Sequence, residues 1–302
     1  MRMAGTKRCD LPAAYDAIAR HNTVRICSAG GMYFLNGREH IEQPKELPKF
    51  SKLIDSGRTI QYEFPKDRAL GRIGSYDQSQ SFQLAQATVT FPAHTRVTFI
   101  ADSSVFVDEP QLFGSFRSDD LYALTVRPQL ELCALKPAMP YIGNLTSLRR
   151  LSVEGANIDD SDVAYLSKLT SLEVLDVNLT GLTGRGMSKL SSLRNLTQLL
   201  FNQNKDIYPM LKALEGSERI STLYLELPDP LLSEEDNRLI GTLKNLESLG
   251  LGDSGATDKT LESLAKLKKL RNLDLTGCSI SREALARFRA LDRKVRLNIT
   301  GP

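Results

Sequence analysis

Apolar residues in the second part of the chain recur in one pattern, Leu-x-x-Leu-x-Leu, in which another apolar residue sometimes replaces a leucine. Four of the six spacings between successive copies are 24 residues, and the other two are 26 and 27 residues. Self-similarity at such a period is typical of a solenoid of stacked units. We therefore predict seven full units and a terminal strand. The copies begin at Leu121, Leu148, Leu172, Leu196, Ile220, Leu246 and Leu270, and the terminal strand motif covers residues 297–301.

The apolar spacing changes within each copy. The first half alternates apolar and polar residues, which predicts a strand, whereas the second half has apolar residues three apart, which predicts a helix. Val163, Leu166 and Leu169 show this helical spacing. One unit cannot bury its apolar side alone, so stacked units share a core between a strand layer and a helix layer. We predict an α/β fold: a curved solenoid with a parallel sheet on its concave side and helices on its convex side.

Residues that favour helix N-termini stand just before the helical runs. Their side-chain oxygens accept hydrogen bonds from the first free backbone N–H groups of a helix. Pro209 is placed at another helix start, and the prolines within residues 227–230 predict a bend or loop. The predicted capping residues are Asp159 or Asp160, Ser233, Thr257 and Ser281.

Leucine usage divides the chain into two regions. Residues 1–120 hold 7 leucines and residues 121–302 hold 40, while the charge balance does not change between them. The first region contains alternating segments that predict strands, so it is mainly β. Because the first unit of a solenoid exposes its apolar side, we predict that this region is a β-rich N-terminal cap. Its predicted elements are a helix over residues 11–20 and strands over residues 23–27, 59–64, 87–91 and 96–100.

The strand segments at residues 148–153, 172–177 and 246–251 resemble leucine-rich repeats, and the resemblance covers residues 121–302. The period resembles the 24-residue repeats of bacterial proteins. The resemblance implies a horseshoe that serves as a non-enzymatic protein-interaction module.

One feature departs from this repeat family. Many such repeats place an asparagine three residues after the third strand leucine, and this chain retains it only at Asn204. We therefore expect small Ser, Thr and Cys side chains to satisfy the turn backbone instead. The equivalent positions hold Ala156, Thr180, Pro228, Ser254 and Cys278.

The charge and the polar residues exclude several functions. Lys and Arg number 39 against 36 Asp and Glu, and a net charge of +3 disfavours general binding to nucleic acid or to a membrane surface. The four cysteines and three histidines show no metal-ligand spacing, and no glycine-rich phosphate loop is present, so we predict no metal, no cofactor and no catalytic residue. Neither a signal peptide nor an apolar run of membrane-spanning length occurs, so we expect a cytoplasmic monomer.

The residues between the strand leucines are the predicted binding residues. Alternation sends the leucines into the core and the third, fifth and seventh positions of each unit to the concave side. Leu200 and Tyr224 then lie side by side on adjacent strands, roughly 4.8 Å apart, with acidic residues around them. An apolar centre with a polar rim is typical of a protein-binding surface. The predicted partner-binding residues are Arg150, Glu154, Val174, Asp176, Asn178, Leu200, Asn202, Tyr224, Glu226 and Asp274.

Two other functions stay open. An enzyme would have its site in residues 1–120, in a pocket lined by Asp16, His21, Cys27 or His40. A polyanion binder would use the basic residues of 266–296, which number ten against three acidic ones and also suit the polar outer face of a C-terminal cap. These basic residues are Lys266, Lys268, Lys269, Arg271, Arg282, Arg287, Arg289, Arg293, Lys294 and Arg296.

Overall fold

The structure is a computed structural model that describes residues 25–28, 31–34, 47–78, 82–127, 135–202, 205–226, 231–291 and 294–299. The chain divides into two compact units, residues 1–46 and residues 47–302. In the first unit, β1 (Arg25–Ser28) and β2 (Gly31–Phe34) form an antiparallel pair. The strand expected at residues 23–27 overlaps β1, and the helix expected at residues 11–20 lies outside the described residues.

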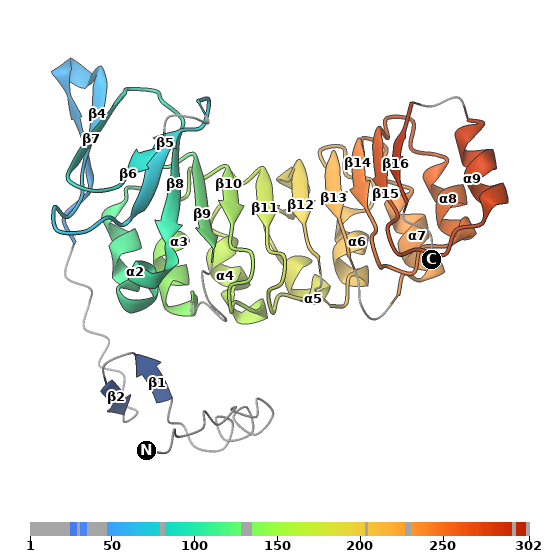
Figure 1. Ribbon diagram of the computed structural model, residues 1–302, viewed down its shortest axis with the longest axis horizontal. Coiled ribbons are helices and arrows are strands. Elements are labelled where there is room, and N and C mark those ends of the chain that lie inside the picture. The colour runs from blue at the N-terminus through green and yellow to red at the C-terminus, as the bar shows by residue number, and fades with distance from the viewer. Residues whose placement is uncertain are drawn as a thin grey trace, which may run out of the picture. The chain divides into compact units, whose positions relative to one another are not determined.

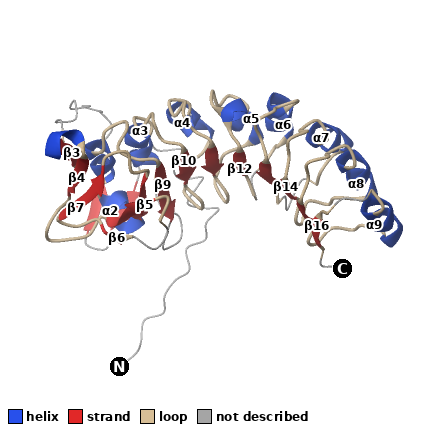
Figure 2. Ribbon diagram, turned by 90° about the horizontal axis from the view of Figure 1, so that it is seen from above, coloured by secondary structure: helices blue, strands red, loops and turns tan. Residues whose placement is uncertain are grey.

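A long sheet runs through the second unit in the order β16-β15-β14-β13-β12-β11-β10-β9-β8-β5-β6. Its strands are parallel from β8 to β16 and lie along the inner side of the curve, with helices on the outer side (Figures 1 and 2). This confirms the predicted α/β solenoid with its parallel concave sheet. The parallel strands are β8 (Val97–Asp102), β9 (Ala123–Arg127), β10 (Arg150–Ser152), β11 (Val174–Asp176), β12 (Gln198–Leu200), β13 (Thr222–Tyr224), β14 (Ser248–Gly250), β15 (Asn272–Asp274) and β16 (Arg296–Asn298).

The strands pair in the register that the repeats predict. Leu151 lies opposite Leu175, and Leu175 lies opposite Leu199, so equivalent positions of successive units are neighbours. These leucines are at most 1% exposed, whereas their strand neighbours Ser152 and Leu200 are half-buried. The alternation between core and concave side is therefore confirmed.

Helices and 3-10 turns follow the strands on the convex side (Figure 2). The N-caps of the turn at 160–162 and of α7, α8 and α9 are Asp159, Ser233, Thr257 and Ser281, as predicted. Pro209 stands in the first turn of α6, also as predicted. The convex elements are η3 (Lys136–Ala138), α3 (Met139–Ile142), η4 (Asp160–Asp162), α4 (Val163–Leu166), α5 (Gly184–Met187), η5 (Leu193–Asn195), α6 (Tyr208–Leu214), α7 (Glu234–Ile240), α8 (Asp258–Leu264) and α9 (Arg282–Arg289).

The part of this unit before the leucine repeats is rich in strands, and its predicted strands are confirmed as β4, β7 and β8. β3, β4 and β7 form a separate antiparallel sheet, and β5 pairs with β8 to extend the long sheet. The parallel strands therefore begin at β8, where Phe99 lies opposite Leu124 in an inward position that leucine takes in the repeats. The remaining elements are β3 (Ser51–Ile54), η1 (Asp55–Gly57), β4 (Thr59–Glu63), β5 (Gly71–Ser75), β6 (Gln83–Leu84), β7 (Thr88–Pro92), α2 (Ser103–Asp108) and η2 (Pro110–Ser115).

Thr, Ser and Cys side chains satisfy three of the turns after the strands, as the missing asparagines led us to expect. Thr180 Oγ1 donates to the Val177 carbonyl at 2.8 Å, and Ser254 Oγ donates to the Leu251 carbonyl at 2.7 Å. The Cys278 thiol lies 3.1 Å from the same Leu251 carbonyl oxygen. Asn204, Pro228 and the corner expected at 227–230 lie outside the described residues.

Candidate functional site

The concave face carries an apolar pair at its centre. Leu200 lies opposite Tyr224, which in turn lies opposite Gly250. A side chain at Gly250 would collide with the Tyr224 ring, so the ring lies over this glycine. The glycine thus leaves space for the aromatic ring against the neighbouring strand, where the ring is half-buried.

A hollow of about 300 Å³ adjoins the Tyr224 ring on the last strands of the sheet. Polar groups from β15 and β16 and leucines from the strand interior line it. The sequence marks this hollow only by glycines at positions 250 and 252, where concave side chains are missing. The lining residues are Tyr224, Leu249, Asn272, Leu273, Asp274, Arg296, Leu297 and Asn298.

Carboxylates surround the apolar pair. Asp274 accepts hydrogen bonds from Thr276 and from the Asn298 amide, the latter at 2.9 Å. Burial alone would raise the pKa of Asp274, but these hydrogen bonds hold its pKa below the usual value. Glu226 has a raised pKa because it is partly buried and because Asp274 and Asp253 repel its charge. The rim is therefore a region of negative potential.

Two predicted binding residues are used within the sheet. The Asn178 side-chain oxygen accepts from the Asn202 N–H at 2.8 Å, and the Asn202 side-chain oxygen accepts from the Glu226 N–H at 3.0 Å. Asn178 is only 9% exposed. An asparagine ladder is thus present, two residues earlier in the unit than the repeat family places it, and it ties β11, β12 and β13 together.

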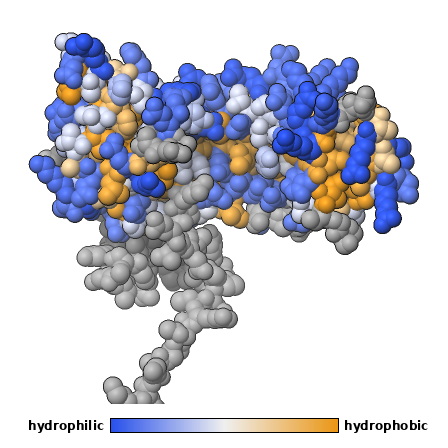
Figure 3. All heavy atoms as spheres, turned by 45° about the horizontal axis from the view of Figure 1, so that its top comes forward, coloured by the Kyte–Doolittle hydropathy of each residue, from blue (hydrophilic) through white to orange (hydrophobic). Residues whose placement is uncertain are grey.

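The other predicted residues lie along the same face but do not form one cluster. Val174 is only 8% exposed, so little of its side chain is accessible to a partner. Asp176 accepts from Ser152 Oγ at 3.0 Å and is half-buried, like Glu154. Arg150 lies at the N-terminal end of the repeats, away from the apolar pair. Figure 3 shows that polar residues cover much of this side of the unit.

An aromatic and arginine cluster beside Arg150 was not predicted. The Tyr76 and Tyr122 rings lie 4.8 Å apart, with the Arg96 guanidinium 5.1 Å and 5.0 Å from their centroids. The Arg150 guanidinium lies 5.2 Å from the Tyr76 ring. Arg96 is also paired with Asp77. Tyr76 and Arg96 lie outside the leucine pattern, so no periodic signal points to them.

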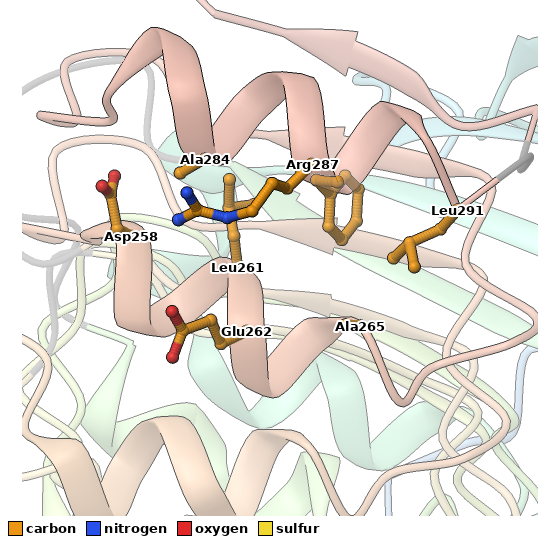
Figure 4. A pocket seen from close by; sticks show the side chains of 8 residues that line it. Asp258, Leu261, Glu262, Ala265, Ala284, Arg287 and Leu291 are labelled. Atoms are coloured by element: carbon orange, nitrogen blue, oxygen red, sulfur yellow. The ribbon is translucent and has the colours of Figure 1, made fainter.

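A second hollow, of about 250 Å³, lies on the convex side between α8 and α9 (Figure 4). The buried side chains of Leu261 and Phe288 are part of its lining. Arg287 points across it toward Asp258. The Asp258 carboxylate also accepts from Ser281 at the start of α9. These contacts explain the hollow as the groove between two successive helices.

The structure does not describe the side chains that an enzyme site in the first region would use. Asp16, His21 and His40 lie outside the described residues, and so does the side chain of Cys27. Within the part of the chain that the structure describes, no three His, Cys, Asp or Glu side chains gather as a metal site. No helix among the described residues has the length and apolar character needed to cross a membrane.

Comparisons with known proteins identify the repeat. The family model described as "Leucine Rich repeat" matches residues 168–191, which span β11 and α5. A "Putative adenylate cyclase regulatory protein" of Trypanosoma equiperdum is 28% identical over 154 residues, which are 51% of this chain and 24% of that protein.

Two solved structures illustrate the structural likeness. An internalin of Listeria monocytogenes has a TM-score of 0.42 and 21% identity, over 60% of this chain and 50% of its own. A protein of Bacteroides fragilis has a TM-score of 0.42 and 12% identity, over 83% of this chain and 95% of its own. This chain thus spans about a quarter of the curated relative and half of the internalin chain.

Proposed function

We propose that this leucine-rich repeat protein binds a protein partner through its concave face, with Leu200 and Tyr224 as the central apolar contact. The observation that carries the proposal is the pairing of these two half-buried side chains in register, within a rim of carboxylates. Solenoids of this kind use their extended concave surfaces for binding. The proposal includes no catalytic step and no cofactor.

Tyr224 is suited to be an anchor for a partner. A tyrosine buries a large area at a small entropic cost, and its hydroxyl tolerates water at the edge of an interface. Gly250 holds open the space into which the ring lies, so the ring is already positioned before binding. Preorganisation of this kind lowers the entropic cost of association.

The charge of the rim defines the partner further. Asp176 and Glu226 flank the apolar pair, and no basic side chain among the described residues forms an ion pair with either of them. We infer a partner that presents an apolar side chain flanked by basic ones. We place the interaction in a bacterial cytoplasm, because the 24-residue period resembles that of bacterial repeats and the scattered cysteines suit a reducing compartment. We propose that the protein acts there as a monomer.

The test is photo-crosslinking from the concave face in a native lysate, followed by affinity measurement with the purified partner. Replacing Tyr224 with alanine should weaken binding roughly 30-fold, which corresponds to about 2 kcal/mol for a lost anchor. Tyr208→Ala is the matched control, because Tyr208 is 44% exposed on the convex helix α6. Asp176→Asn should mainly slow association and reduce its salt dependence.

A polyanion at the C-terminal end is the second candidate. Arg271, Lys294 and Arg296 line a hollow of about 660 Å³, and no ion pair joins them to another described residue. Binding that survives the double change Leu200→Ala and Tyr224→Ala, but is lost when Arg271 and Arg296 are neutralised and falls steeply with salt, would favour this candidate and contradict the concave-face proposal.

A further inference from the structure

We propose that Arg150 receives a carboxylate side chain, aspartate or glutamate, of the protein partner. This inference rests on the proposed function and adds the direction in which the partner lies on the concave face. The site is composite, because Arg150 belongs to the repeats whereas the ring that supports it, Tyr76, follows β5 in the preceding region. Such a contact would fix the partner at the N-terminal end of the repeats.

The Arg150 guanidinium is held in place but is not neutralised by any residue that the structure describes. Its centre lies 5.2 Å from the Tyr76 ring centroid, and Tyr76 is supported by Tyr122 and by Arg96. Arg96 already has Asp77 as its carboxylate partner. No carboxylate of the described residues lies within ion-pairing distance of Arg150. Among the described residues, the two arginines of the cluster therefore differ in that only Arg96 has a carboxylate partner.

The surroundings of Arg150 leave room for an external acceptor. Its neighbours across the sheet are Ala123 and Val174, which are 6% and 8% exposed and carry no polar side-chain atom. Neither can accept a hydrogen bond from the guanidinium. Arginine has five N–H donors in a planar fork that matches a carboxylate in a bidentate arrangement. A carboxylate group is thus the ligand that these donors fit.

The charge pattern favours one carboxylate over a polyanion. Glu154 and Asp176 follow Arg150 along the same face and would repel a chain of phosphates. A single acidic side chain with basic and apolar neighbours meets less of this repulsion, because its basic neighbours can face Glu154 and Asp176. A nucleic acid is therefore the competing ligand that the experiment must distinguish.

The sheet geometry sets the spacing that the partner must have. Arg150 lies on β10 and Leu200 on β12, two strands away, which is about 10 Å across the sheet. The two residues also differ by two positions along their strands, so the direct separation is about 12 Å. An extended partner segment rises about 3.4 Å per residue. Its acidic residue should therefore lie three or four positions from its apolar residue.

The experiment selects a phage-displayed library of random 12-residue peptides on the full chain, in parallel with the variants Arg150→Glu and Arg149→Glu. Arg149 is the matched control because it is adjacent in sequence and already paired with Glu173. Peptides from the unchanged protein and from Arg149→Glu should carry an acidic residue three or four positions from an apolar one. Arg150→Glu should select lysine or arginine at that position.

One selected peptide is then synthesised with its acidic residue intact or changed to lysine, and binding is measured by fluorescence polarisation. The lysine peptide should bind the unchanged protein at least roughly 10-fold more weakly, as expected when a hydrogen bond to a charged group is lost. Arg150→Glu should reverse this preference. Tyr76→Phe should retain the preference, whereas Tyr76→Ala should reduce it. Thermal unfolding of each variant checks that the fold is intact.

The outcomes separate the two proposals. Peptides that depend on Leu200 and Tyr224 but bind Arg150→Glu unchanged overturn the inference and leave the proposed function standing. Peptides that need Arg150 but ignore Leu200 and Tyr224 retain the carboxylate site and overturn the proposed function. Displacement of the peptides by single-stranded DNA at physiological salt overturns the carboxylate assignment in favour of a polyanion, and a library that yields no peptide dependent on this face overturns both.

Discussion

The strands before the leucine repeats and the repeats themselves are packed in different ways. Around Phe99, rings from distant parts of the sequence converge: Phe64, Phe106 and Phe116 have centroids 6.4, 5.8 and 5.0 Å from it. In the repeats, each leucine instead contacts its equivalent in the next unit, as Leu151 does with Leu175. Stability should therefore depend on a few central rings in the first region and be distributed over many equivalent leucines in the second.

The buried Asp120 links the two regions through hydrogen bonds. Asp120 is 5% exposed, and its carboxylate accepts from Ser51 Oγ on β3 and from the Arg117 N–H. Its carbonyl accepts from the buried Tyr62 hydroxyl at 2.7 Å. The residue directly before the first leucine copy is thus held by the preceding strands, so the start of the repeats depends on contacts outside them.

The largest expected effect follows from removing the first region. Residues 121–302 alone should fold poorly, because β9 loses β8 and its inward residues Leu124 and Val126 lose the cover that β8 provides. Residues 47–302 are the control, since they keep β8 together with β5 and β9, the two strands that pair with it. Circular dichroism and sedimentation would test this. A shorter fragment as monomeric and as heat-resistant as the control would show that the repeats need no cap.

Single core substitutions should distinguish the two kinds of packing. Phe99→Ala should cost about 3 to 5 kcal/mol of unfolding free energy, and Leu249→Ala about 2 to 5 kcal/mol. Ser248→Ala, on the concave side of the same strand, should change it by at most about 0.5 kcal/mol. Denaturant unfolding measures these costs, and equal effects at 248 and 249 would contradict the strand register.

Hydrogen exchange should reveal how far the destabilisation caused by each core substitution spreads through the sheet. For Leu249→Ala, faster exchange should be confined to β13, β14 and β15, because each unit contacts only its neighbours. For Phe99→Ala it should extend through β8 to α2 and to the end of β4, because Phe106 of α2 and Phe64, which directly follows β4, lie against Phe99. If faster exchange extended equally far in the two variants, the proposed difference in packing between the two regions would be wrong.

The smallest expected effect concerns the pH dependence at Asp120. Burial raises the pKa of Asp120, with hydrogen bonds from Ser51 and Arg117 opposing the change. An aspartate in the unfolded chain has a pKa of about 3.9 and loses its proton just above that pH, whereas Asp120 in the folded protein still keeps its proton there. The unfolding free energy should therefore fall as pH rises through that window.

Asp120→Asn tests this directly. The variant loses one acceptor and should be less stable than the unchanged protein near pH 4, by about 1 to 3 kcal/mol. It carries no ionisable group at this position, so the difference should narrow as pH rises. Urea unfolding from pH 4 to 7 measures it. A difference that widens with pH would mean that the hydrogen bonds outweigh burial.

Periodicity along the chain was enough to establish the repeats. The register of the strands, the inward leucines and the capping roles of Asp159, Ser233, Thr257 and Ser281 all follow from local spacing, because a strand and a helix each repeat over a few residues. The concave position of Leu200 and Tyr224 follows for the same reason. A constraint that recurs every 24 residues is visible without any three-dimensional information.

Contacts between residues far apart in the chain were not visible in this way. The position of the Tyr224 ring depends on Gly250 in the next unit, and the Arg150 guanidinium depends on Tyr76 in the preceding region. The roles of Asn178 and Asn202 as sheet ladders depend on backbone N–H groups of the neighbouring strands. The sequence places Asn178 and Asn202 one repeat apart but does not show which groups they contact, because side-chain direction and packing arise only once the strands are placed side by side.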